Sequence, residues 1–85
     1  MLEKGKIKVA LVIPAYNEER VIRQVVKDLS NVFKTSDYTY QIIVVDDGSK
    51  DKTAQEAKLG GAIVIRHILN SGSGGATATG LSYAF

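Results

Sequence analysis

The stretch Val-Ile-Pro-Ala-Tyr-Asn-Glu-Glu at Val12–Glu19, together with Val-Val-Asp-Asp-Gly-Ser at Val44–Ser49, decides the fold of this chain. Each stretch begins with apolar residues typical of a strand and continues into polar residues that form turns and open helices. Strands that alternate with helices pair in parallel through right-handed crossovers. Open α/β sheets of this kind bind ligands at the carboxyl ends of their strands. The two stretches therefore predict an α/β fold with a binding crevice beside both turns.

Three apolar segments predict the strands of the sheet. They are expected at 7–13, 40–45 and 63–66. The first is rich in β-branched residues, is apolar at odd and even positions in its second half, and ends at Pro14, so we expect it at the centre of the sheet. Helical spacing of apolar residues between these segments gives the order strand, helix, strand, helix, strand, helix, which predicts a parallel β-sheet.

Two helices are predicted between the strands. Asn17 is expected to cap the first, with Glu18 and Glu19 in its first turn, where the helix dipole favours acidic residues. Seven apolar residues recur at helical spacing and are expected to pack on the sheet: Val21, Ile22, Val25, Val26, Leu29, Val32 and Phe33. The second helix is expected at 52–59 and ends at the two glycines that follow, because glycine is favoured where a helix terminates in a left-handed conformation.

The segment from His67 to Phe85 differs from the rest of the chain. It contains no Asp, Glu, Lys or Arg and is rich in glycine. A terminal helix exposed to solvent would carry a charged outer face. Two interpretations remain open, namely a buried helix covered by a continuation of the chain, and a glycine-rich loop near a phosphate that begins a helix. We expect one domain in residues 1–85 and a chain that continues past Phe85.

Composition and charge narrow the function classes. The net charge is only +2 and the basic residues are scattered, so no nucleic acid partner is expected. The chain has no cysteine, which excludes disulfides and thiolate metal sites. The longest apolar run, Val9–Ile13, is far shorter than the roughly 20 residues of a membrane span, so no transmembrane segment is expected in this chain.

The two turns offer groups that suit a nucleobase. Backbone groups of the turn after the first strand can meet the edge of a base, and Tyr16 supplies a ring for stacking and a hydroxyl. Asp47 supplies an acceptor for the N–H of a uracil or guanine ring, while Asp46 points to the opposite side of the strand. One aspartate is expected to bind ligand and the other to hold the turn.

Each turn also has an ordinary structural interpretation. Asp-Asp-Gly-Ser is most often a turn before a helix, in which Ser49 or Asp51 satisfies free backbone N–H groups. Glu18 is typical of a first helical turn, and Tyr16 of an aromatic at a rim. Because both turns follow adjacent parallel strands at one edge of the sheet, we expect their side chains to converge on one crevice.

Three segments taken together resemble the family 2 glycosyltransferases of the GT-A fold. They are Val12–Glu19, then Val44–Ser49 with Asp51 and Thr53, then Asn70–Ala76 with Gly80 and Leu81. The sequence Pro-Ala-Tyr-Asn-Glu-Glu is similar to that of dolichyl-phosphate mannose or glucose synthases. The resemblance implies the Rossmann-like N-terminal half of a GT-A fold, so residues 1–85 are expected to be a partial nucleotide-sugar-binding domain, truncated at its C-terminus.

The resemblance also implies which residues line the nucleotide pocket. They are Pro14, Ala15, Tyr16, Glu18, Asp46, Asp47, Gly48 and Arg66. Asp47 is expected to contact the base of a UDP- or GDP-sugar, with Asp46 beside it. Arg66 is expected near the nucleotide, and a solvated charge at a strand end is the alternative for it. His67 is expected to be structural, because no Ser, Cys or metal-ligand partner is spaced to use it.

The Asp-x-Asp metal motif, the catalytic base and the acceptor site of such enzymes lie beyond Phe85, so no catalytic residue and no metal ligand is predicted here. The full-length enzyme is expected to use Mg²⁺ or Mn²⁺ and to transfer a sugar from a UDP- or GDP-sugar to an acceptor, with a polyprenyl or dolichyl phosphate as the candidate. The chain alone is expected to be inactive.

Other expectations follow from the same resemblance and from the truncation. The resemblance places the enzyme in the cytoplasm or at the cytoplasmic face of a membrane. Uncovered sheet edges and helix faces favour self-association, so a homo-oligomer is expected. The alternative function is a non-catalytic nucleotide-binding or assembly module that is complete at this length.

Overall fold

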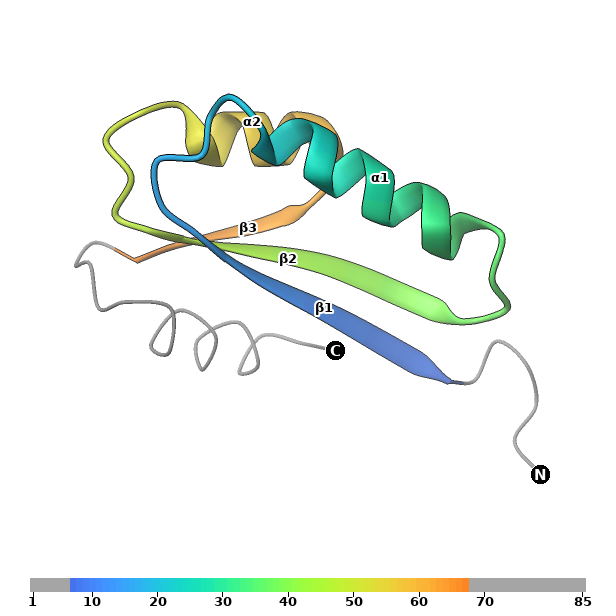
Figure 1. Ribbon diagram of the computed structural model, residues 1–85. Coiled ribbons are helices and arrows are strands. Elements are labelled where there is room, and N and C mark those ends of the chain that lie inside the picture. Colours follow the sequence, from blue (N-terminus) through green and yellow to red (C-terminus); the bar gives the residue numbers. More distant parts are fainter. Residues whose placement is uncertain (1–6, 68–85) are drawn as a thin grey trace.

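The structure is a computed structural model that describes residues 7–67, and it contains a parallel three-stranded sheet with two helices on one face (Figure 1). The elements are β1 (Lys8–Ala15), α1 (Ile22–Lys34), β2 (Thr39–Asp47), α2 (Thr53–Gly60) and β3 (Ile63–His67). The predicted alternation of strands and helices and the parallel sheet are confirmed over this range. The helix predicted after the third strand lies outside the described residues.

The strand order is β1-β2-β3, with both pairs parallel. Within residues 7–67, β2 is therefore the central strand and β1 lies at an edge, so the prediction of a central first strand is wrong for this part of the chain. Pro14 lies inside β1, opposite Val45, instead of ending the strand. An edge strand tolerates proline because one side of the strand needs no donor.

The core has two parts, one on each face of β2. On the helix side, Ile42 and Val44 pack with the buried residues Ala15, Ile22, Val26 and Ala57. On the other face, Ile43 and Val45 are fully buried, with Val12 and Ile65 packed against them. Successive residues of a strand point to opposite faces, so an uninterrupted apolar run supplies both clusters.

The face of α1 that packs on the core is narrower than predicted. Ile22 and Val26 are buried and Leu29 packs against the same cluster, which is the i, i+4, i+7 stripe of a helix that lies on a sheet. Three of the seven residues predicted to face the sheet are exposed, with Val32 leaving 67% of its surface accessible; they are Val21, Val25 and Val32. The helical spacing of the valines therefore predicts a wider buried face of α1 than the structure has.

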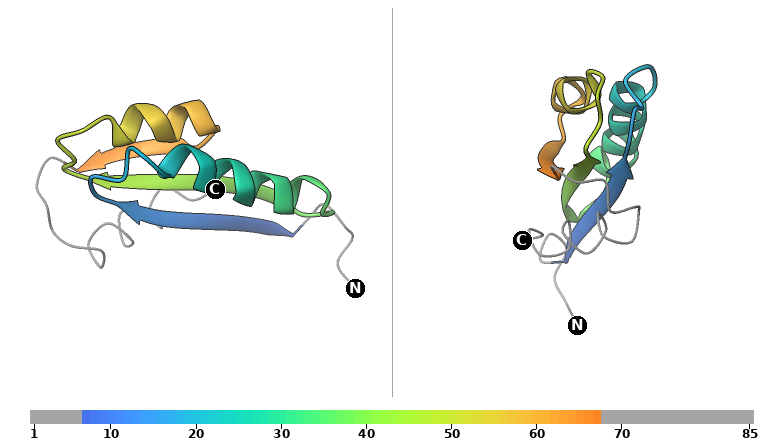
Figure 2. Two further views of the ribbon diagram at one scale, coloured as in Figure 1. Left: turned by 45° about the horizontal axis from the view of Figure 1, so that its top comes forward. Right: turned by 90° about the vertical axis from the view of Figure 1, so that its left-hand side faces the viewer.

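The two helices lie side by side above the strands (Figure 2). Gly60 makes this possible, because a Cβ there would lie 2.9 Å from both the Arg23 carbonyl oxygen and the Val26 Cβ. Across the same contact the Arg23 guanidinium donates to both carboxylate oxygens of Glu56, at 3.1 and 2.9 Å. Gly61 ends α2 in the left-handed conformation predicted for it, with φ 106°. The C-terminal end of α2 is thus packed closely against the first half of α1.

Neither α1 nor α2 is long and apolar enough to cross a membrane, and the described range contains no other helix.

Candidate functional site

The turn between β1 and α1 does not have the predicted capping geometry. Asn17 adopts a left-handed backbone, with φ 52°, whereas a cap residue is normally extended. The N–H groups of Val21 and Ile22 donate to the Glu18 carbonyl at 3.1 and 2.9 Å, and α1 begins only at Ile22. The prediction that Asn17 caps the helix is therefore wrong. The first turn of α1 contains no acidic residue, so Glu18 and Glu19 lie in the preceding turn.

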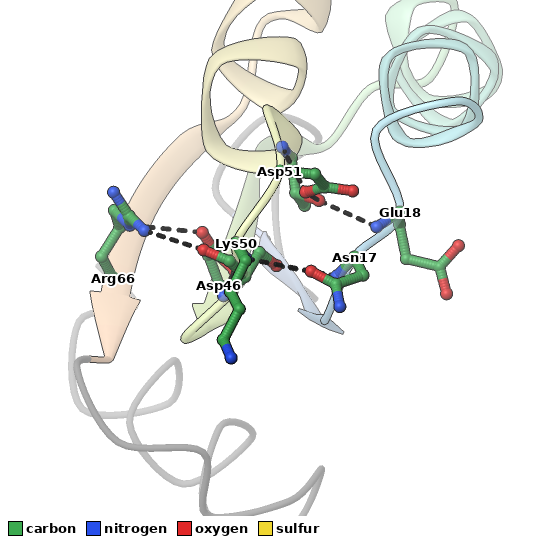
Figure 3. A network of polar contacts seen from close by, with 8 residues as sticks. Asn17, Glu18, Asp46, Lys50, Asp51 and Arg66 are labelled. Carbon is green, nitrogen blue, oxygen red and sulfur yellow. Dashed lines mark hydrogen bonds and ion pairs between the residues drawn. The ribbon is translucent and has the colours of Figure 1, made fainter.

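Three consecutive backbone N–H groups of this turn donate to side chains that follow β2. The bonds run from Asn17 to Ser49 Oγ at 2.8 Å, from Glu18 to Thr53 Oγ1 at 2.8 Å and from Glu19 to Asp51 Oδ2 at 3.3 Å. Two bonds return, from the N–H of Lys50 to Asn17 Oδ1 at 3.0 Å and from the N–H of Lys52 to Glu19 Oε2 at 3.4 Å. We call this set of five hydrogen bonds the turn clasp, and Figure 3 shows the part of it around Asn17, Glu18, Lys50 and Asp51.

Asp51 is the acceptor that joins the clasp to the start of α2. Its Oδ1 accepts from the backbone N–H of Thr53 at 2.9 Å and also from the Thr53 hydroxyl. Desolvation acts to raise the pKa of Asp51, but the hydrogen bonds from Thr53 and from the Glu19 N–H outweigh it and lower the pKa below its ordinary value of 3.8. Ser49 and Asp51 were both predicted to accept from free backbone N–H groups. Asp51 accepts from the N–H of Thr53 at the start of α2, whereas Ser49 accepts from the N–H of Asn17.

Asp46 holds the turn after β2. Its side chain is fully buried, and Oδ1 accepts from the Ser49 N–H at 3.0 Å. Oδ2 lies 3.3 Å from Arg66 Nε in an ion pair, although the geometry is not that of a hydrogen bond. Arg66 Nη2 also donates to the Ser49 carbonyl at 3.2 Å. Arg66 thus fastens the turn from the neighbouring strand, where it is the register partner of Asp46, instead of extending freely into solvent.

The strand register brings the predicted base-reading residues together. Ala15 pairs with Asp46, so Tyr16 and Asp47, the next residue of each chain segment, lie at adjacent ends of β1 and β2. Tyr16 is 43% exposed, whereas Asp47 is buried. The two turns thus lie at one edge of the sheet, as predicted, whereas the convergence of their side chains on one crevice stays a prediction.

The other predicted residues lie around the same edge. Pro14 and Gly48 are half-buried, Ala15 is buried, and Glu18 and Arg66 are exposed. Gly48 has φ 80°, a conformation that favours glycine. Figure 3 shows the Glu18 carboxylate pointing away from the other labelled residues.

A shallow hollow of about 280 Å³ lies beside the clasp. It is lined by Asn17, Glu18, Glu19, Arg20, Val21 and Asp51. Neither Tyr16 nor Asp47 lines it, so it is separate from the predicted nucleobase surface. Among residues 7–67 no group of three or more His, Cys, Asp or Glu side chains is arranged to hold a metal ion.

Sequence reasoning missed the clasp itself. Ser49, Asp51 and Thr53 were recognised as parts of a turn and a motif, but their bonds to the backbone of residues 17–19 were not predicted. One signal was present. Asn, unlike most residues, tolerates a left-handed backbone, so its position after Tyr16 is compatible with this turn.

The model for "Glycosyl transferase family 2" matches residues 10–85. The chain belongs to this family. Its relatives include the uncharacterized protein MJ1222 of Methanocaldococcus jannaschii, 49% identical over 96% of this chain and 32% of that protein. The UDP-N-acetylglucosamine–dolichyl-phosphate N-acetylglucosaminyltransferase of Methanococcus voltae is 41% identical over 88% of this chain and 35% of its own length. The family 2 chain thus spans about a third of these relatives.

Solved structures share the fold. Mannosyl-3-phosphoglycerate synthase from Rubrobacter xylanophilus superposes with a TM-score of 0.80 at 26% identity, over 93% of this chain and 28% of that one. Glucosyl-3-phosphoglycerate synthase from Mycobacterium tuberculosis, in complex with Mn²⁺, UDP-glucose and phosphoglyceric acid, gives a TM-score of 0.61 at 33% identity, over 74% of this chain and 22% of that one. The family 2 chain thus has the predicted N-terminal part of a GT-A fold.

Proposed function

We propose that the sheet edge at Tyr16 and Asp47 binds the nucleoside of a nucleotide-sugar donor, and that the whole protein transfers the sugar from a UDP- or GDP-sugar to an acceptor. The proposed acceptor is a polyprenyl or dolichyl phosphate. One observation carries the proposal: the register of β1 and β2 puts an aromatic ring and a carboxylate at adjacent strand ends. The names of the M. voltae relative and of the M. tuberculosis complex support a uridine nucleotide and, for the former, a dolichyl phosphate.

Each predicted residue has a role in this proposal. The exposed Tyr16 ring stacks on the base, and the Asp47 carboxylate accepts an N–H of the base. Pro14 and Ala15 shape the start of the pocket, and Gly48, which has no Cβ, lets the nucleoside approach the backbone. Glu18 has an exposed carboxylate on the same turn, which accepts hydrogen bonds from the ribose hydroxyls.

Asp46 and Arg66 support the pocket from below. Asp46 is fully buried and already accepts from the Ser49 N–H, so its role is to hold the turn in place for Asp47. Arg66 leaves 60% of its side chain exposed, which keeps its positive charge available to a diphosphate beside the turn.

A divalent cation is part of the proposed full-length reaction, but residues 7–67 contain no group of acidic side chains arranged to bind it. The M. tuberculosis relative has been crystallised with Mn²⁺ and with Mg²⁺. The described residues do not fit such a site, because their acidic side chains are committed to the clasp and to Arg66 or do not cluster. The proposal therefore assigns nucleoside binding, and no step of sugar transfer, to this part of the chain.

Placement in the cytoplasm or at the cytoplasmic face of a membrane is proposed together with the lipid acceptor.

Isothermal titration calorimetry of the purified chain with UDP, GDP and their sugars tests the donor site. We expect binding of one nucleoside diphosphate and at least a tenfold loss in Asp47→Asn, equivalent to about 1.4 kcal/mol or more, because the neutral amide oxygen is a weaker acceptor for the N–H of the base than the carboxylate. Asp28→Asn is the matched control, since Asp28 lies on the exposed side of α1, where its carboxylate accepts from the Gln24 side-chain amide at 2.8 Å. Absence of binding by any nucleotide would refute the donor site in this chain.

A further inference from the structure

The turn clasp depends on one residue with an unusual backbone. Within residues 7–67, Asn17 is the only residue other than glycine with a positive φ. Asparagine tolerates this region because its short amide side chain makes local hydrogen bonds that offset the steric cost. The chain reverses here, directly after Tyr16. As a result the N–H groups of residues 17–19 face the turn after β2.

Asn17 contributes two of the five bonds of the clasp. Its N–H donates to Ser49 Oγ at 2.8 Å, and its side-chain Oδ1 accepts from the Lys50 N–H at 3.0 Å. Figure 3 shows the Asn17 amide pointing toward Lys50. Glu19 is the other residue that takes part in two of the five bonds, but its bonds are the longest, at 3.3 and 3.4 Å. Each remaining residue of the clasp takes part in one bond. Asn17 is therefore the strongest single link between the turns.

The position of Asn17 joins the two base-reading residues. It directly follows Tyr16, and its partner Ser49 is two residues after Asp47. The intervening Gly48 has φ 80° and no side chain to restrict it. The strand pairing ends at Ala15 and Asp46, and the Asn17 bonds continue the connection between the two segments beyond that pair. The bonds close a short ring of residues that includes both.

We propose that Asn17 is a positioning residue for nucleoside recognition. It holds the Tyr16 ring in register with the Asp47 carboxylate and does not itself touch the nucleotide. The inference rests on the proposed function, since it specifies how the same site is organised. A site that is ordered before binding loses less conformational freedom when the ligand arrives, so its affinity is higher.

Three variants separate positioning from general stability. Asn17→Gly keeps the left-handed backbone and removes the acceptor for Lys50, whereas Asn17→Asp keeps an acceptor oxygen at the same place. Tyr40→Phe is the control, because it also removes side-chain hydrogen bonding, here the contacts of the Tyr40 hydroxyl with Ser30 Oγ at 3.0 Å and the Ser30 carbonyl at 3.5 Å, at the opposite end of β2. All three are checked for folding by circular dichroism before use.

The first measurement is nucleotide affinity by calorimetry with UDP and GDP. We expect about tenfold weaker binding in Asn17→Gly, equivalent to about 1.4 kcal/mol, and affinity within about twofold of wild type in Tyr40→Phe. Asn17→Asp is expected to bind within about threefold of wild type, at a salt concentration that screens its added charge. Equal affinity of wild type and Asn17→Gly would overturn the inference while leaving the donor site intact.

The second measurement needs no ligand. Amide hydrogen exchange of the wild type and Asn17→Gly is compared at residue 17, Lys50 and Ser49. We expect the Lys50 amide to exchange at least tenfold faster in Asn17→Gly. In Tyr40→Phe the exchange rate of the Lys50 amide should equal that of the wild type. Unchanged exchange would overturn the inference. If the wild type binds no nucleotide, the proposed function fails, and exchange alone decides whether Asn17 fastens the two turns.

Discussion

The Thr53 hydroxyl offers a sharp test of the clasp, because it can be removed without changing the shape of the side chain. Thr53 is fully buried, and its Oγ1 accepts from the Glu18 N–H at 2.8 Å and donates to Asp51. Valine keeps the two branches at Cβ but cannot make either bond. Thr53→Val therefore leaves the partners of the hydroxyl without it, while the packing of α2 is retained.

The size of the effect follows from how well water can replace the hydroxyl. Leaving a buried donor or acceptor without its partner costs about 1–3 kcal/mol. Glu18 is exposed, so water can replace the hydroxyl as an acceptor for its N–H in part. We therefore expect a loss of stability in the lower part of this range, about 1–2 kcal/mol. A domain of this size loses roughly 4–8 °C of Tm per kcal/mol, so the Tm should fall by about 4–16 °C.

Urea unfolding followed by circular dichroism measures the loss of stability, and hydrogen exchange locates it. The midpoint should fall at unchanged m-value, and the Glu18 amide should exchange faster. Thr53→Ser is the control, because it keeps the hydroxyl and loses only a methyl group, so its Glu18 amide should stay protected. A Thr53→Val protein as stable as wild type, or one in which the Glu18 amide keeps its protection, would refute the account of the clasp.

Three other predictions concern the packing of the helices, the pH dependence of stability and self-association. Gly60→Ala should destabilise the fold by about 1–3 kcal/mol in urea unfolding, because its Cβ meets the rigid Arg23 carbonyl and Val26 Cβ at 2.9 Å; the exposed Gln55→Ala should stay within about 0.5 kcal/mol, and equal stability of both variants would contradict the packing. The pKa of Asp51 is lowered in the folded state, so its ionised form contributes stability that is complete above the ordinary value of 3.8 and is lost as the pH falls through the lowered pKa. Unfolding midpoints measured from pH 6 to pH 2 should therefore decline less steeply in Asp51→Asn than in wild type, and parallel declines would count against the hydrogen bonds described. The exposed valines of α1 and the edge of β1 predict self-association, which light scattering at high concentration would disprove by showing a monomer.

The clasp gives the site a property that neither turn has alone. Binding sites of α/β proteins lie on loops, which are mobile unless other contacts order them. Here the backbone donors of one turn are satisfied by the side chains of the other, and Asp46 and Arg66 hold the second turn from beneath. The proposed nucleoside surface therefore rests on an ordered base.

The sequence determined the features that depend on local order. β-branched apolar runs predicted β1, β2 and β3 within a few residues of their observed ends, and the glycine pair at the end of α2 predicted the left-handed Gly61. Parallel pairing followed from the alternation of elements. Because parallel strands end at one edge, the meeting of the turns at Tyr16 and Asp47 could also be predicted.

Only the tertiary structure decided how each residue is used. Asn17 has a good helix-capping side chain, yet its backbone is left-handed because Ser49 and Lys50, more than thirty residues away, bond to it. The same holds for Asp46, whose ion pair with Arg66 depends on the pairing of β2 with β3. Local propensities amount to a few tenths of a kcal/mol up to about 1 kcal/mol per residue, and several hydrogen bonds between distant segments outweigh them. Sequence therefore specifies which groups reach the edge of the sheet, and the contacts between the two turns specify which of them remain available to a ligand.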